Sequence, residues 1–131
     1  MSTEYLSVDL ILDSPKSLED LLSHFGEEII VHHFTQTQSV FHYEIGFSSD
    51  YDSPDSAISN LCGLINGLPT TLRTDWANCI SRIFDIGFEA DSGAPLFSTP
   101  IKSFTLSQLP FLGVDLAITI YTDKHDYPSA T

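Results

Sequence analysis

Lysine and arginine are scarce in this chain of 131 residues, which has five of them against 18 aspartates and glutamates and a formal net charge of −13 at pH 7. Because nucleic-acid phosphates are bound chiefly by lysine and arginine, the charge argues against a nucleic-acid reader. It disfavours anionic membranes and speeds encounter with basic surfaces, although acidity also serves solubility alone. Residues 1–55 carry eleven acidic residues and only one basic residue, Lys16.

Long apolar runs and a cysteine framework are also missing. No stretch reaches the roughly 18 to 20 apolar residues of a membrane span, and the N-terminus has no signal-peptide pattern. These absences predict a cytoplasmic protein. The two cysteines, Cys62 and Cys79, lack CxxC spacing and are expected to be reduced and structural.

Motifs of catalysis and metal binding are absent as well. The sequence has no GxSxG, GxxxxGK[ST], GxGxxG or HExxH, which predicts no enzyme and no cofactor. His24, His32, His33 and His42 lie within nineteen residues. Adjacent histidines of a strand point to opposite sides, so at most one of His32 and His33 is expected to join His42, and no metal site is predicted.

What the chain does contain is alternating and helical apolar patterns. Strands are predicted where apolar and polar residues alternate or β-branched and aromatic residues gather, at 4–12, 28–34, 39–47, 80–90 and 114–121. In the first strand Leu6 and Val8 are expected on the inner side and Tyr5 and Asp9 on the outer side.

Helical spacing and capping signals predict the remaining elements. Ser14-Pro15 and Ser53-Pro54 are typical of helix starts, which gives helices at about 15–25 and 54–66. A short helical turn is expected around Trp76. A further helix over 104–111 is expected to bury Phe104, Leu106, Leu109 and Phe111.

The order of these elements predicts one α+β domain over residues 1–131, with an ordered core of about 4–122 and a polar tail at 123–131. We expect a mixed, mostly antiparallel sheet of about five strands with helices packed on one face. Since the strands are apolar on one side only, the other face should meet water.

That exposed sheet face is the candidate interaction surface. Tyrosine is enriched in interface hot spots, and the expected outward residues mix tyrosines with carboxylates. They are Tyr5, Asp9, His42, Glu44, Asp85, Glu89, Asp115, Thr119 and Tyr121, extended by Asp50, Tyr51, Asp52 and Asp55 of the loop at 48–55. Any sheet face in water has a similar composition, so the sequence leaves open whether the face or the loop makes the contact.

Three segments resemble a family of short bacterial domains of unknown function, numbered 4279 among such domains. They are the strand and helix from Tyr5 to Gly26, the strand ending Phe41-His42-Tyr43-Glu44-Ile45, and the closing segment from Leu106 to Tyr121. The resemblance implies no active site. In size and architecture such domains are similar to bacterial immunity proteins, which neutralise a toxin of the same strain.

The leading hypothesis is an immunity-type protein that binds a basic toxin domain, most plausibly a nuclease. A phage or host regulatory protein that mimics DNA and occupies a nucleic-acid enzyme is the alternative, and a small hydrolase or metal-binding domain is a second one. The sequence does not give the partner or the oligomeric state.

Overall fold

The chain alternates strands and helices, and its computed structural model describes residues 3–93 and 96–122. The predicted tail at 123–131 lies outside the described residues. The elements are β1 (Glu4–Ser14), α1 (Glu19–Phe25), a 3-10 turn (Gly26–Glu28), β2 (Ile29–Gln36), β3 (Phe41–Phe47), α2 (Pro54–Asn66), α3 (Thr70–Ala77), β4 (Ser81–Glu89), α4 (Ser103–Leu112) and β5 (Asp115–Tyr121).

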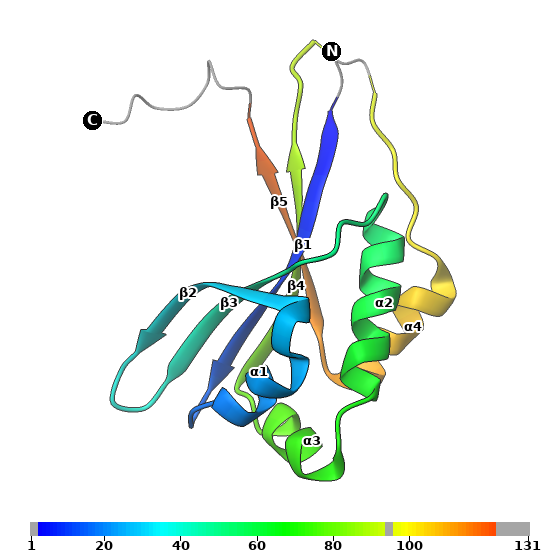
Figure 1. Ribbon diagram of the computed structural model, residues 1–131. Helices are drawn as coiled ribbons and strands as arrows, with labels where there is room; N and C mark the ends of the chain where they lie inside the picture. Colours follow the sequence, from blue (N-terminus) through cyan, green and yellow to red (C-terminus); the bar gives the residue numbers. More distant parts are fainter. Residues whose placement is uncertain (1–2, 94–95, 123–131) are drawn as a thin grey trace, which may run out of the picture.

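The five strands form one sheet in the order β2-β3-β1-β4-β5, with the helices against one side of it (Figure 1). Every neighbouring pair is antiparallel except β4 and β5, which are parallel because α4 crosses between them. The prediction of a single α+β domain with a mixed, mostly antiparallel sheet is therefore confirmed.

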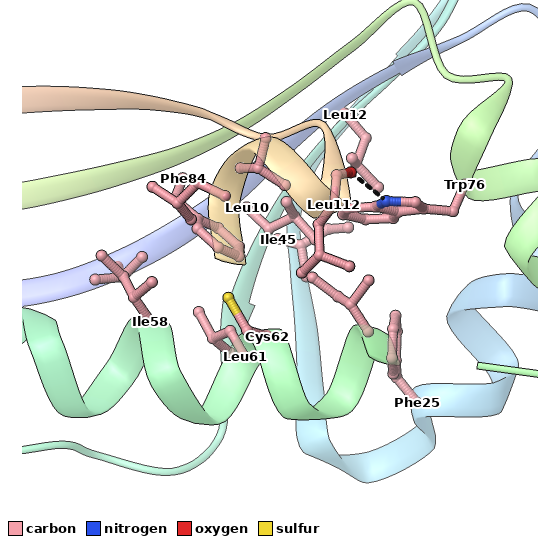
Figure 2. Close-up of a cluster of buried hydrophobic side chains, with 14 of the residues drawn as sticks. Leu10, Leu12, Phe25, Ile45, Ile58, Leu61, Cys62, Trp76, Phe84 and Leu112 are labelled. Carbon is pink, nitrogen blue, oxygen red and sulfur yellow. Dashed lines mark hydrogen bonds between the residues drawn. The ribbon is translucent and has the colours of Figure 1, made fainter. Parts of the chain in front are cut away.

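The core lies between the sheet and the helices (Figure 2). Alternate side chains of the central strands point into it, and α2 meets them with residues one turn apart. The fully buried side chains include Leu10, Leu12, Ile45, Ile58, Leu61, Cys62, Phe84 and Ile86. Trp76 closes one end, where its indole Nε1–H donates to the Leu112 carbonyl at 2.9 Å.

The two predicted helix starts differ in outcome. Ser53 caps α2 as expected, since its Oγ accepts from the Ser56 amide at 3.2 Å and Pro54 occupies the first turn. The start at Ser14-Pro15 is wrong, because Ser14 pairs with Phe41 as the last residue of β1. The helix begins at Glu19 instead.

At the start of α1, the helix is capped by a side chain from the sheet, that of Tyr43 in β3. Leu18 and Tyr43 are both buried, and the Leu18 amide donates to the Tyr43 hydroxyl oxygen at 3.0 Å. The hydroxyl satisfies an amide that the helix itself leaves unpaired. This bond ties the entrance of α1 to β3.

A β-bulge at Leu6 corrects the predicted orientation of the first strand. The pairing of β1 with β4 runs from Tyr5↔Phe88 directly to Ser7↔Gly87, so Leu6 is the extra residue. Tyr5 therefore packs on the core side against Phe88, with ring centroids 6.2 Å apart. Leu6 is left 47% exposed.

The buried side of α4 also differs from the prediction. Thr105, Leu109 and Leu112 are buried, whereas Phe104 and Phe111 are 72% and 77% exposed. A carboxylate fixes this rotation, because Asp55 of α2 accepts from the Lys102 amide at 2.9 Å and bonds the Thr105 hydroxyl. A buried threonine with a polar partner thus takes the position expected for an apolar residue.

The alternation predicted for β5 holds, yet its inner side is poorly covered. As an edge strand it lies beyond most of the helix layer, and Leu116, Ile118 and Ile120 are 37%, 62% and 61% exposed. An edge strand with exposed apolar residues is prone to pair with other chains.

Replacing Tyr43 by phenylalanine should lower the free energy of unfolding by about 1–2 kcal/mol, because the buried Leu18 amide loses its acceptor. Urea unfolding followed by circular dichroism measures the change. Tyr121→Phe, at an exposed position, serves as the control and should stay within about 0.5 kcal/mol of the parent. Equal effects of the two substitutions would contradict this role of the Tyr43 hydroxyl.

Candidate functional site

The sheet face that the helices leave uncovered, called the open face below, carries most of the predicted contact residues. Asp9 lies opposite Asp85, and Asp13 lies opposite His42 in the strand pairing. The predicted residues on this face are Asp9, His42, Glu44, Asp85, Glu89, Asp115, Thr119 and Tyr121. The structure therefore brings eight of the predicted residues onto one surface.

His42 is held between two carboxylates on the open face. Its Nδ1 lies 2.6 Å from Asp13 Oδ1, and its Nε2 lies 2.9 Å from Glu44 Oε2. Hydrogen bonds to Glu44 and Asp13 raise the pKa of the imidazole, so the cation that donates at both nitrogens is favoured. With both nitrogens engaged, the ring has no free position for accepting a proton from a substrate.

The expectation that His32 and His33 point to opposite sides is wrong. Pairing of β2 with β3 runs from Val31↔Ile45 directly to His33↔Glu44, which makes His32 the extra residue of a bulge. The His32 imidazole lies over Gly46, where a Cβ would collide with it. The His33 ring lies 6.3 Å from that of His42, so three histidines share the open face.

These histidines and carboxylates do not form a metal-binding set. Within residues 3–93 and 96–122, no group of three or more histidine, cysteine, aspartate or glutamate side chains is arranged to hold a metal ion. Cys62 and Cys79 are buried free thiols. Burial raises the pKa of the Cys62 thiol to about 11, which keeps it protonated.

A cleft opens where the sheet divides. The pairing of β1 with β3 stops at Leu10↔Ile45, whereas its pairing with β4 continues to Glu4. Beyond that point the chain leaves β3 and runs to the first turn of α2 (Figure 1). The resulting cleft has a volume of about 620 Å³, with residues 4–9 on one side and residues from 46–52 on the other, and the segment 97–99 also lines it.

The walls of this cleft are acidic and aromatic. Four carboxylates line it, from Glu4, Asp9, Asp50 and Asp52, and its described lining includes no lysine or arginine. Side chains of α2, including Ala57 and Leu61, add an apolar part. The predicted residues Asp50, Tyr51 and Asp52 thus belong to the cleft, together with Tyr5 and Asp9.

Asp9 joins the cleft to the open face. Burial raises the pKa of its carboxyl group above the ordinary value, the His32 imidazole opposes the shift, and the carboxylates of Asp85 and Glu44 add to it. Like charges directly opposite on neighbouring strands are destabilising. The ionised carboxylate of Asp9 is therefore held here at a cost to the folded state.

Burial and nearby carboxylates also affect the pKa of the Tyr5 hydroxyl. Burial, followed by the nearby Asp9, Asp50 and Tyr51, raises the pKa of its hydroxyl to about 12. The hydroxyl consequently remains a neutral donor at physiological pH. Tyr5 reaches the site from the inner side of the sheet, in contrast to the predicted outward position.

Asp55 does not join this surface. Its carboxylate bonds the Lys102 amide and the Thr105 hydroxyl, and these bonds lower the pKa of the carboxyl group. Asp55 therefore anchors α4 to α2, a structural role that differs from the predicted contact.

Basic side chains are used elsewhere in the fold. The Arg82 guanidinium donates to the carbonyls of Trp76 at 2.9 Å and Gly113 at 2.8 Å, and the Arg73 guanidinium donates to the Leu68 carbonyl at 2.9 Å. Lys16 pairs with Asp75 of α3 at 2.7 Å. These three cations gather around α3, at the end of the molecule away from the N-terminal part of β1 (Figure 1). None of these three cations is paired with a carboxylate of the cleft.

Four titratable residues of the open face and the cleft escaped the sequence prediction: Glu4, Asp13, His32 and His33. The first strand was expected to end at 12, so Asp13, the next outward residue after Asp9 and Ile11, was left out. His32 was missed because alternation does not locate a bulge. The proximity of Glu4 to residues 50–52 depends on the tertiary fold and has no local signal.

Comparison of the chain with protein-family models, curated proteins and solved structures finds no match. None of the helices in the described parts of the chain has the length and apolar character needed to cross a membrane.

Asp9→Asn should stabilise the protein at pH 7. A raised carboxyl pKa means that the folded state binds the proton more tightly than the unfolded state, so folding is penalised once both are ionised. Removing that charge should raise the free energy of unfolding by about 0.2–1 kcal/mol, scaled for the partial exposure of the side chain. Urea unfolding at several pH values measures the difference from the parent.

The gain should shrink as the pH falls toward and below 3.8, the ordinary value for aspartate. Asp115→Asn, at an exposed position of the same face, is the matched control. A loss of stability in Asp9→Asn at pH 7 would show that this carboxylate supports the fold.

Proposed function

We propose that this protein is an immunity-type inhibitor that binds a basic protein domain, most plausibly a bacterial nuclease toxin. The separation of charge supports the proposal most directly. Asp9, Glu44 and Asp85 crowd together on the open face, and Asp50 and Asp52 line the adjoining cleft. The arginines are bonded to backbone carbonyls around α3 instead of to these carboxylates.

An acidic surface of this kind suits a toxin that binds nucleic acid. Such a toxin presents lysine and arginine where it holds phosphates, and carboxylates on a sheet can occupy those positions. The net charge accelerates encounter through long-range attraction, while the tyrosines supply contact area that slows release. The proposal includes a cytoplasmic location, in which inhibitor and toxin are made together.

The test compares three forms of the protein as bait in affinity purification from the native organism: the parent, Glu44→Gln/Asp50→Asn/Asp52→Asn, and Glu19→Gln/Asp20→Asn/Glu27→Gln, whose three sites are exposed residues of α1 and the 3-10 turn. The last two lose the same charge, but only the first of them changes the proposed surface. We expect the parent and the Glu19 triple variant to retain one basic protein that the Glu44 triple variant loses.

The association rate of that purified protein should fall about tenfold or more between about 50 and 500 mM salt. The same protein should be toxic when expressed alone and harmless with the inhibitor, and its gene should lie beside that of the inhibitor. Equal retention by both triple variants, or a rate indifferent to salt, would contradict the proposal. A nucleic-acid enzyme that is not toxic would instead identify a DNA mimic.

A further inference from the structure

The cleft has the form of a missing strand position in the sheet. Over Glu4–Asp9, β1 pairs with β4 on one side, and no strand of the described residues pairs with its other side. The backbone N–H and C=O groups on that side therefore face the cleft. Unpaired strand edges of this kind accept an added strand.

The space matches an extended peptide. Neighbouring strands of a sheet lie about 4.8 Å apart, and six residues of a strand span about 20 Å. The cleft follows the whole of Glu4–Asp9 and has a volume of about 620 Å³. An extended segment of five or six residues thus matches the length of this edge.

The two sides of the cleft differ in chemistry. On the open face an added strand would meet the Asp9 carboxylate, and on the inner side it would meet Ala57 and Leu61 of α2 and the Phe97 ring, which packs against Phe88. Side chains of a strand alternate between its two sides. A segment in which basic and small apolar residues alternate would place its cations beside Asp9 and its apolar side chains against α2, with Asp50 and Asp52 at the opposite wall.

We infer that the cleft between residues 4–9 and 46–52 is a β-strand addition site for an extended basic segment of the partner. This inference rests on the proposed function and specifies how the partner is held. Backbone hydrogen bonds to the β1 edge supply affinity for any strand, while the four cleft carboxylates select a cationic one.

The probe is the acetylated and amidated hexapeptide Lys-Val-Lys-Val-Lys-Val, with binding measured by isothermal titration calorimetry on the full chain. Two further peptides carry N-methyl groups on either the lysines or the valines, which removes the donors of one peptide edge and leaves the charge unchanged. At least one of them should bind about tenfold more weakly than the parent peptide. This arm uses the unmodified protein and does not depend on the folding of any variant.

The second arm compares Asp9→Asn/Asp50→Asn/Asp52→Asn with the Glu19→Gln/Asp20→Asn/Glu27→Gln control. The cleft variant should bind the peptide about tenfold more weakly than the parent protein, and the control should lose less than about threefold. Replacing the lysines of the peptide by glutamates should abolish binding.

No binding of the parent peptide, or equal losses in the two triple variants, would overturn the cleft as the site. Unchanged affinity for both N-methylated peptides would overturn strand addition, even if the affinity still depended on salt. The purification and toxicity tests use the whole partner protein and do not depend on the hexapeptide. If a basic toxin is captured through its charge but the hexapeptide does not bind the cleft, this inference is wrong and the proposed function still holds.

Discussion

The unequal pairing of β1 is the constraint on which the site depends. As the central strand, β1 is paired on both sides only over Leu10–Asp13, and over Glu4–Asp9 it is paired with β4 alone. The first part places Leu10 and Leu12 in the core. The second part leaves a strand edge bordering the cleft. A single strand thus anchors the sheet and borders the proposed binding cleft.

The distribution of charge follows from the same architecture. Around α3, Arg82 donates to the carbonyls at the end of the helix, and Lys16 pairs with Asp75. Since these side chains are held at that end of the molecule, Asp9 and Asp85 repel one another on the open face, whereas Glu44 is paired with the His42 imidazole. Carboxylates kept together at a cost in stability are typical of surfaces whose charge is used for recognition.

The sequence predicts the elements better than it predicts the site. Alternation located β1, β3, β4 and β5, β-branched and aromatic residues located β2, and Ser53-Pro54 located α2, because these signals are local. Two bulges could not be located from the sequence, and each of them changes the site. The bulge at Leu6 turns Tyr5 toward the core, and the bulge at His32 brings two histidines to one face. The rotation of α4 also escaped prediction, since the bond between Asp55 and Thr105 joins residues far apart in the chain.

Amide hydrogen exchange by NMR, with and without the lysine–valine hexapeptide, tests the free edge of β1 most directly. In the free protein, the amides of Glu4–Asp9 that do not point toward β4 should exchange rapidly, whereas amides of Leu10–Asp13 should be protected without interruption. Saturating peptide should then protect the rapid amides of Glu4–Asp9. Uniform protection of β1 in the free protein, or new protection confined to β5, would contradict the account.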